Sequence, residues 1–173
     1  MIDRELIRLL DERGVAHCLI GAAAIAVHGW ARYSADVDLL TMDPQVLEPG
    51  FWSRHPAVEI RSGDLDDPLA GVVRWPADIP HDVIVGRKRV MRLAVETAEM
   101  VPSVGCRVAT PLCIVLLKLE AGGAQDRHDI VSLIQTRRAI DGAPWLQEVS
   151  ARVSLVSKRG QRIWQQLERE LSP

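Results

Sequence analysis

The sequence predicts an α/β fold, in which a mixed β-sheet is flanked by helices and followed by a helical C-terminal segment. Short apolar stretches alternate with amphipathic ones over the first 110 residues. Beyond Pro111 the apolar residues recur at helical spacing. The 173 residues and a hydrophobic fraction of 47% suit one folded unit with a core of ordinary size.

The elements are expected in a regular order. Helices are predicted where apolar residues recur every third or fourth position, over residues 2–13, 22–30, 88–100, 111–123, 125–137, 144–153 and 158–171. Strands are predicted where apolar residues are continuous or alternate with polar ones, over residues 15–21, 36–41, 57–63, 70–75, 81–86 and 106–110. This order divides the chain into an α/β core, residues 1–110, and a C-terminal helical region packed on it, residues 111–173.

Charge and composition argue against several classes of protein. A net charge of −2 does not indicate a globally basic nucleic-acid binder. No apolar run approaches the ~20 residues that cross a bilayer, and the charged N-terminal segment does not resemble a signal peptide. The three cysteines show no CxxC spacing, which is typical of reduced thiols. We therefore expect a cytoplasmic protein with no membrane partner.

The segment SADVDLL, residues 34–40, carries the first chemical signal. Alternation along a strand puts Asp36 and Asp38 on one face, where two carboxylates repel each other. A bound cation removes that repulsion, and Mg²⁺ prefers carboxylates, water and phosphate oxygens. Asp82 begins the strand HDVIVG and can share this face. The pattern predicts that Asp36, Asp38 and Asp82 are Mg²⁺ ligands; the alternative is a solvated strand end.

A second signal precedes the aspartates. Gly21 closes a predicted strand, and a helix begins directly after it. Such a junction lets the backbone approach a triphosphate, and the helix N-terminus favours anions. A phosphate-binding turn, two metal carboxylates and a third carboxylate on a later strand would form one coherent site.

These residues carry a family resemblance. The segment IGAAAIAVHGWARYSADVDLL resembles the signature of minimal nucleotidyltransferases of the DNA polymerase β-like superfamily, in the branch of AbiEii-type toxins. That branch shows Gly-Gly-x-Ala, then His-Gly, then Arg-x-Thr-x-Asp-Ile-Asp. The matching residues are Gly21, Ala24, His28, Gly29, Arg32, Ser34, Asp36, Val37 and Asp38. Ala22 replaces the second glycine, and Ser34 replaces the threonine. A second block, ATPLCIVLLKLEAGGAQDRHDIVSL, is similar to the family's lysine-containing helix and the Asp-x-x-Asp-Ile helix that follows it.

The resemblance implies Mg²⁺-dependent transfer of a nucleoside monophosphate from a nucleoside triphosphate to an acceptor hydroxyl, with release of pyrophosphate. Asp36 and Asp38 would hold the metals and the triphosphate, and Asp82 would also help to activate the acceptor hydroxyl. Contacts to the nucleotide would come from Gly21, Ala22, Arg32, Ser34 and Lys118. The acceptor stays open among RNA, protein and small molecules. A toxin of this branch would have a cognate antitoxin as partner.

Several residues have two interpretations. Lys118 either faces phosphates or extends to water from an apolar helix. Asp126 either is a late catalytic carboxylate or complements the helix dipole. Asp129 is the other candidate for that late carboxylate, but it is expected to pair with neighbours of Arg127 or with another basic residue such as Arg32. His28 is expected to be a hydrogen-bonded core residue rather than a ligand.

Two other functions are compatible with the sequence. One is a catalytically silent nucleotide-binding module that keeps the same fold. The other is a metal-dependent HD phosphohydrolase, because His81-Asp82 and His128-Asp129 are HD dipeptides. Phosphohydrolases of that kind are helical, whereas Asp82 is predicted on a strand.

Overall fold

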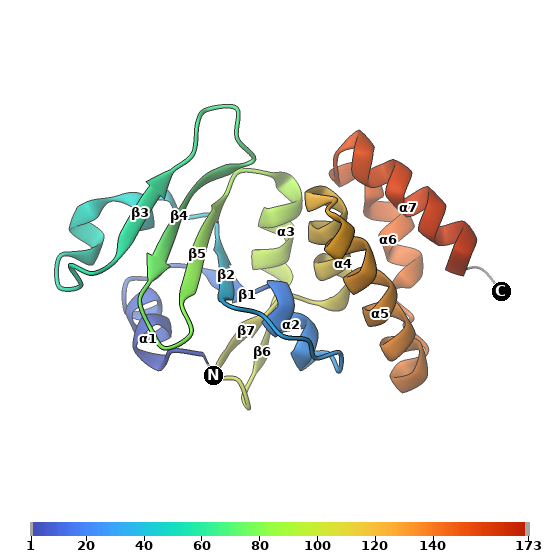
Figure 1. The fold of residues 1–173 in the computed structure, drawn as a ribbon, viewed down its shortest axis with the longest axis horizontal. Helices are drawn as coiled ribbons and strands as arrows, with labels where there is room; N and C mark the ends of the chain where they lie inside the picture. Colours follow the sequence, from blue (N-terminus) through green and yellow to red (C-terminus); the bar gives the residue numbers. More distant parts are fainter. Residues whose placement is uncertain (1, 172–173) are drawn as a thin grey trace.

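The structure is a computed structural model that describes residues 2–171. Within this part of the chain, one seven-stranded mixed sheet has the strand order β3-β4-β5-β2-β1-β7-β6 (Figure 1). The strands are β1 (His17–Leu19), β2 (Val37–Thr41), β3 (Glu59–Ser62), β4 (Leu69–Trp75), β5 (His81–Gly86), β6 (Glu99–Val101) and β7 (Cys106–Val108). The α/β fold with a mixed sheet is therefore confirmed.

The helices surround this sheet and continue beyond it at the C-terminal end. They are α1 (Arg4–Glu12), α2 (Gly21–Val27), α3 (Arg89–Thr97), α4 (Pro111–Ala121), α5 (Ala124–Asp141), α6 (Leu146–Arg152) and α7 (Lys158–Leu171). Short 3-10 turns occupy residues 44–47, 49–52 and 153–155. None of the helices in residues 2–171 has the length and apolar character needed to cross a membrane.

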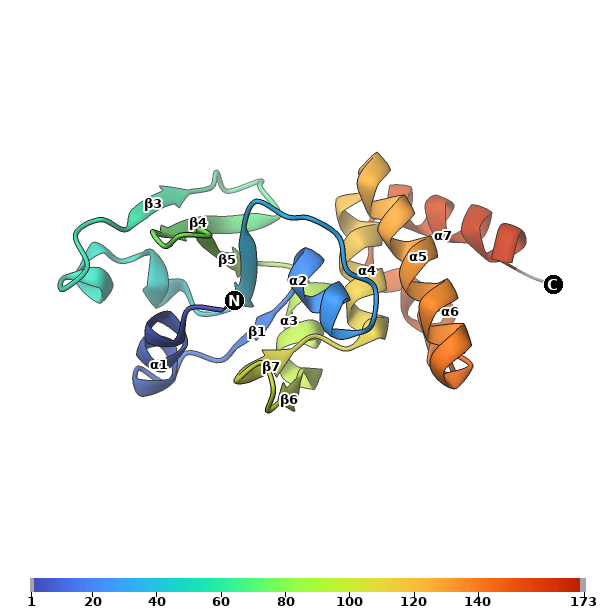
Figure 2. The same ribbon diagram turned by 60° about the horizontal axis from the view of Figure 1, so that its bottom comes forward.

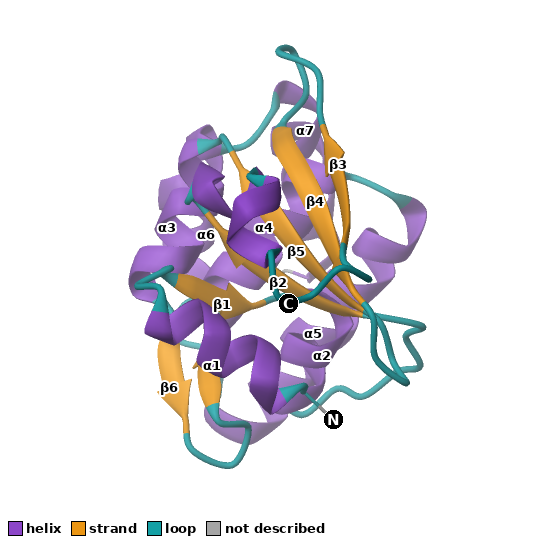
Figure 3. Cartoon of the chain, turned by 90° about the vertical axis from the view of Figure 1, so that its left-hand side faces the viewer, coloured by secondary structure: helices purple, strands orange, loops and turns teal. Residues whose placement is uncertain are grey.

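Strand direction changes across the sheet. β2 runs parallel to β5, and β1 runs parallel to β7, whereas the other neighbouring strands are antiparallel. Figure 3 shows the resulting twisted sheet, with β3 and β4 at one end and β6 at the other. The central position of β2 brings its first residues beside the first residues of β5, because parallel strands begin at the same edge of a sheet.

The two faces of β4 and β5 differ in burial. Val73, Trp75, Val83 and Val85 are buried on one face, and the intervening side chains are half-buried on the other. In Figure 2, α1 and the turns of residues 44–52 lie on one side of β3, β4 and β5, and no described helix covers the other side of these strands. The alternation of apolar and polar residues thus produces one packed face and one open face.

The C-terminal helices join the sheet through a shared core. α4 is almost entirely apolar and packs against α3, α5 and α7. A single cluster of buried side chains runs from the sheet through Leu116 and Leu119 of α4 to Trp164 and Leu167 of α7. Figure 1 shows α5, α6 and α7 beyond α4, on the side away from β3.

Three boundaries differ from the sequence prediction by three residues or more. The helix predicted over residues 22–30 ends at Val27, because the chain turns at Gly29 with φ +102°. The helix predicted over residues 88–100 ends at Thr97, and the following residues form β6, which pairs with β7. Tertiary pairing overrides helical spacing there. α5 continues to Asp141, four residues beyond the predicted end at residue 137.

Candidate active site

A row of charged side chains crosses four neighbouring strands on the open face. Asp38 of β2 lies opposite Asp82 of β5, and Asp82 lies opposite Arg74 of β4. Arg74 in turn lies opposite Glu59 of β3. Residues in direct register share a face of the sheet, and adjacent strands are separated by about 4.8 Å. We call these four residues the charged row.

Asp36 lies immediately before β2, at the Asp38 end of the charged row. The backbone there is held by a 3.0 Å hydrogen bond from the amide of Val37 to the carbonyl of Pro80. Asp36 raises the pKa of both Asp38 and Asp82 by electrostatic repulsion, so the three carboxylates lie within reach of one another's charge. The structure therefore brings together the three predicted metal aspartates.

The environment of Asp38 and Asp82 disfavours their negative charge. Burial, together with the charges of Asp36 and Asp82, raises the pKa of Asp38 to about 6. Burial also raises the pKa of Asp82, against the opposing effect of the Arg74 guanidinium. A cation between these groups would relieve both effects.

The chemistry of these side chains suits Mg²⁺ that is partly coordinated by a substrate. Among residues 2–171, no three or more His, Cys, Asp or Glu side chains form a ready-made metal cage. Mg²⁺ is commonly held by one or two carboxylates, with water and substrate phosphates completing its shell. Asp36 accepts a 3.0 Å hydrogen bond from the Ser34 hydroxyl, and both oxygens of Asp82 accept from Arg74 at 3.2 Å.

Gly21 brings the backbone directly against Asp38. Its φ is +64°, and a Cβ atom built on it would lie 2.1 Å from Oδ2 of Asp38. The amide of Ile20 donates a 2.9 Å hydrogen bond to the backbone carbonyl of Asp38. Only glycine therefore allows this conformation and this approach. The Ala22 side chain is only 4% exposed, so the group that residue 22 can offer to a ligand is its backbone.

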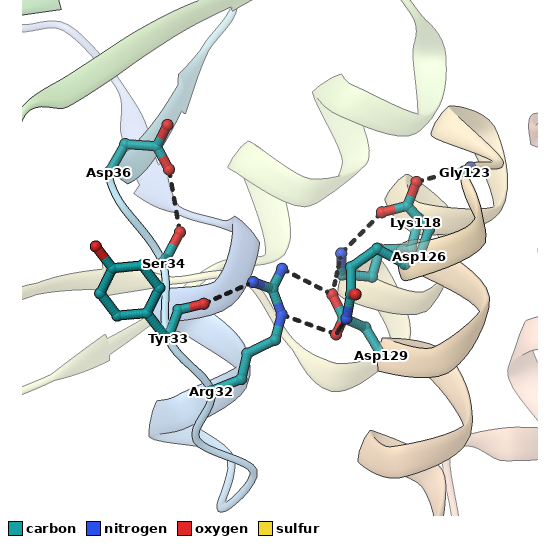
Figure 4. Close-up of polar contacts among 9 residues, drawn as sticks. Arg32, Tyr33, Ser34, Asp36, Lys118, Gly123, Asp126 and Asp129 are labelled. Atoms are coloured by element: carbon teal, nitrogen blue, oxygen red, sulfur yellow. Dashed lines mark hydrogen bonds and ion pairs between the residues drawn. The ribbon is translucent and has the colours of Figure 1, made fainter.

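A buried carboxylate holds the opposite side of the site together. Asp129 of α5 is fully buried and accepts hydrogen bonds from Nε and Nη2 of Arg32 at 2.9 and 3.0 Å (Figure 4). Lys118 Nζ of α4 lies 2.7 Å from the same carboxylate, and Gln125 Nε2 donates to it at 3.0 Å. Burial alone would raise the pKa of Asp129, but these three donors lower it below its ordinary value. The expected pairing of Asp129 with Arg32 is confirmed.

Arg32 and Lys118 also act on the aspartates. Both positive charges lower the pKa of Asp38, against the stronger effect of burial, so they lie within its electrostatic reach. In Figure 4, Arg32 lies between the segment of Ser34 and Asp36 on one side and the helices of Lys118 and Asp129 on the other. Positive and negative groups therefore face each other across the site.

Asp126 lies at the turn between α4 and α5. Its Oδ2 accepts from the backbone amide of Gly123 at 2.9 Å and its Oδ1 accepts from Lys118 at 2.9 Å. It thereby caps α5 and holds the lysine ammonium. Figure 4 shows it on the side of the site opposite Asp36. His28 lies just after α2, where its Nε2 is 2.8 Å from the carbonyl oxygen of Ala109. That contact agrees with a structural role for His28.

Sequence reasoning missed two polar partners of the site. Arg74 is the one charged residue in the apolar segment AGVVRW, and its register with Asp82 became apparent only in the sheet. Gln125 lies four residues before Asp129, a spacing at which helical side chains meet. A charged residue in an otherwise apolar strand was the available signal for Arg74.

Solved structures share the overall arrangement of the chain. An antigenic nucleotidyltransferase-like protein from Paracoccidioides brasiliensis superposes with a TM-score of 0.56 and 17% identity, over 96% of this chain and 85% of that one. The chain has a nucleotidyltransferase fold. No family model matches its sequence, and no curated protein sequence matches it significantly.

The antibiotic-resistance factor ANT(2'')-Ia has the same nucleotidyltransferase fold. Its solution structure gives a TM-score of 0.53 at 12% identity, over 96% of this chain and 92% of that one. Its crystal structure in complex with adenylyl-2''-tobramycin gives 0.52 at 10% identity, over 94% of each chain. The similarity includes the C-terminal helices as well as the sheet, because nearly the whole chain is covered.

Proposed function

We propose that this protein is a Mg²⁺-dependent nucleotidyltransferase. The observation that carries the proposal is the meeting of Asp36, Asp38 and Asp82 beside the Gly21 turn, within a nucleotidyltransferase fold. Three carboxylates that repel one another on an open sheet face are costly unless a cation joins them. A metal-bound triphosphate would supply that cation, and its negative charge would be balanced by Arg32 and Lys118.

Each aspartate has a role in this proposal. Asp36, Asp38 and Asp82 would be the protein ligands of Mg²⁺, which when bound would neutralise charge on the triphosphate and on the attacking and leaving oxygens. Asp36 and Asp38 orient the triphosphate, and Asp82 lies at the acceptor end. There the Asp82 carboxylate would accept a proton from the acceptor hydroxyl.

The triphosphate would bind on the side of Asp38 where Gly21, Arg32 and Lys118 lie. The backbone amides of Gly21 and Ala22 would approach the phosphates, because no side chain of residue 21 blocks them. Arg32, Ser34 and Lys118 would add donors, and the buried Asp129 keeps Arg32 and Lys118 in place before the nucleotide arrives. Asp126 would act at this end by holding the Lys118 ammonium rather than by touching the reacting atoms.

The transfer step follows from this arrangement. The oxygen of the acceptor hydroxyl forms a bond to the α-phosphorus, and the bond from that phosphorus to the oxygen bridging it to the β-phosphate breaks. Pyrophosphate leaves, and the hydroxyl proton passes to the Asp82 carboxylate. The chain's contribution is mainly to position both substrates and to stabilise charge.

The biological role is proposed on the motifs alone. The match to the AbiEii-type pattern in residues 20–40 supports a cytoplasmic toxin with a cognate antitoxin as its partner. RNA, protein and small-molecule acceptors are all compatible with the chemistry. The neighbour that was solved with adenylyl-2''-tobramycin supports testing an aminoglycoside among them.

A silent nucleotide-binding module is the second candidate. The pairing of Asp82 with Arg74, and of Lys118 with two carboxylates, favours it, because these ligands are already engaged. An HD phosphohydrolase is not supported. His81 lies on β5, and its two ring nitrogens contact the amide of Asp3 at 3.0 Å and the carbonyl oxygen of Ile79 at 2.8 Å.

Label transfer tests the proposal. The full chain is incubated with Mg²⁺ and each α-labelled nucleoside triphosphate, with total tRNA, host proteins or tobramycin as acceptor. We expect label on one acceptor class with the wild type and none with the double variant Asp36→Ala/Asp38→Ala. Circular dichroism and thermal unfolding check that this variant is folded. Nucleotide binding by calorimetry without any transfer would favour the silent module, and equal transfer by the double variant would refute the metal assignment.

A further inference from the structure

The charged row has two different ends. Beyond Asp38 lie Gly21, Arg32 and Lys118, which are the groups proposed for the triphosphate. Beyond Asp82 lies the open face of β4 and β3. In-line transfer requires the attacking and leaving oxygens to lie on opposite sides of the α-phosphorus. The acceptor must therefore approach over β4 and β3.

Arg74 is the first residue on that approach. Its Nη1 lies 3.2 Å from each oxygen of Asp82, so one cation spans the carboxylate that the metal would use. The Arg74 side chain is 40% exposed, whereas that of Asp82 is 16% exposed. The guanidinium can therefore move toward solvent while the carboxylate stays in place. A second arginine, Arg61 of β3, lowers the pKa of Asp82 through its charge and is exposed on the same side.

We propose that Arg74 is a specificity-determining residue that alternates between Asp82 and the acceptor. Its guanidinium pairs with Asp82, which is also a proposed metal ligand. With a metal held by Asp36, Asp38 and Asp82, the guanidinium would turn toward the acceptor and bind a phosphate close to the acceptor hydroxyl. The inference rests on the proposed function, and it specifies an anionic, phosphate-bearing acceptor rather than a polycationic one. A planar guanidinium suits such recognition because it donates two parallel hydrogen bonds to phosphate.

The charges around the approach support this choice. Arg61 is paired with Glu59 at 3.3 Å, but both side chains are more than half exposed, so this surface pair is easily exchanged for a ligand. With Asp82 neutralised by a bound metal, the strands β3 and β4 would present two cations, Arg74 and Arg61, and one carboxylate, Glu59. A polycationic acceptor would meet like charge there.

The first test measures Mn²⁺ affinity and needs no catalysis. Arg74→Gln should bind Mn²⁺ about threefold to tenfold more tightly than the wild type, because the competing cation is gone. Arg152→Gln is the matched control: its arginine is also 40% exposed and paired with a carboxylate, Glu148, but it lies in α6. An Arg74→Gln affinity within twofold of the wild type would overturn the proposal.

The second test measures acceptor binding with Mn²⁺ and a non-hydrolysable nucleoside triphosphate. A labelled short oligoribonucleotide should bind the wild type more tightly with Mn²⁺ than without it, and Arg74→Gln should lose this gain. If adenosine monophosphate competes with the labelled oligoribonucleotide, a single phosphate is sufficient for binding. If it does not compete, binding requires a longer RNA strand. Preferential binding of tobramycin would refute the acceptor assignment. A wild type that binds no Mn²⁺ at all would instead overturn the proposed function itself.

Discussion

At the scale of single residues, Gly21 and Asp38 depend on each other. The backbone of Gly21 occupies the space next to the Asp38 carboxylate, in a conformation that disfavours any residue with a Cβ atom. Partial burial of Asp38 and the nearby charges of Asp36 and Asp82 raise its pKa to about 6. Both residues would be poor choices for stability alone, which is typical of functional sites.

Substituting Gly21 should show whether its close contact with Asp38 is needed for nucleotide binding, apart from the strain of its positive φ. Gly21→Ala forces the Asp38 carboxylate to move, so we expect loss of Mn²⁺-dependent nucleotide binding and a decrease of about 1–3 kcal/mol in the free energy of unfolding. Gly14→Ala is the control, because Gly14 has a similar φ of +70° but no atom lies within 4 Å of the position that an added Cβ would take. Calorimetry should show normal binding for Gly14→Ala; normal binding for Gly21→Ala would contradict the role of this contact.

The Asp38 charge should also appear in the pH dependence of stability. Its pKa in the folded state exceeds the ordinary value of 3.8, so protonation favours folding, and this stability is lost as the pH rises through about 6. Without metal, Asp38→Asn should therefore be more stable than the wild type by about 1–3 kcal/mol at pH 8. The difference should shrink toward pH 4. Urea unfolding in the presence of a chelator measures it, with the exposed Asp66→Asn as the control.

At the scale of elements, Asp129 connects α5 to α4 and to the segment before β2. It forms ion pairs with Arg32 of that segment and with Lys118 of α4. One carboxylate therefore fixes the relative positions of three segments. Such a buried, multiply bonded carboxylate is costly to disturb, because its partners would be left without a counter-charge. The arrangement keeps Ser34 and Asp36 at a set distance from the phosphate-binding side.

Removing this charge should loosen the site and the fold. We expect Asp129→Asn to reduce the free energy of unfolding by about 2–4 kcal/mol near pH 7 and to weaken nucleotide binding. Because the native pKa of Asp129 is lowered, its contribution is complete above the ordinary pKa and is lost as the pH falls through the lower native value. Asp141→Asn, which removes an i,i+4 pair with Arg137, is the control and should cost less than about 1 kcal/mol. Equal effects in urea unfolding would contradict the special role of Asp129.

At the scale of the whole molecule, the sheet and the C-terminal helices share one hydrophobic cluster. Contact between α4 and α7 is close at Gly160, where an added Cβ atom would lie 2.4 Å from the carbonyl oxygen of Leu119. α4 also carries Lys118, so the packing of α7 supports the helix that supplies a phosphate-binding group. The C-terminal helices are therefore expected to unfold together with the core.

Gly160→Ala tests that coupling. Alanine normally favours a helix over glycine, but here the clash with α4 should dominate and lower the free energy of unfolding by about 1–3 kcal/mol. The melting temperature should fall by about 2–10 °C in a single transition. Gly50→Ala, where nothing lies within 4 Å of the added atom, should leave it unchanged. Two separate transitions in calorimetry would show that the helices form an independent unit.

The sequence alone predicted the α/β class, most element positions and the shared sheet face of Asp38 and Asp82, because these depend on local periodicity and residue chemistry. HDVIVG is a strand over its full predicted length, since its alternation matches one buried and one open face. Only the tertiary structure decided that β6 forms, that Lys118 joins the pair of Arg32 and Asp129, and that Arg74 lies against Asp82. Strand order and register bring together residues far apart in the chain, and no local pattern encodes those pairings.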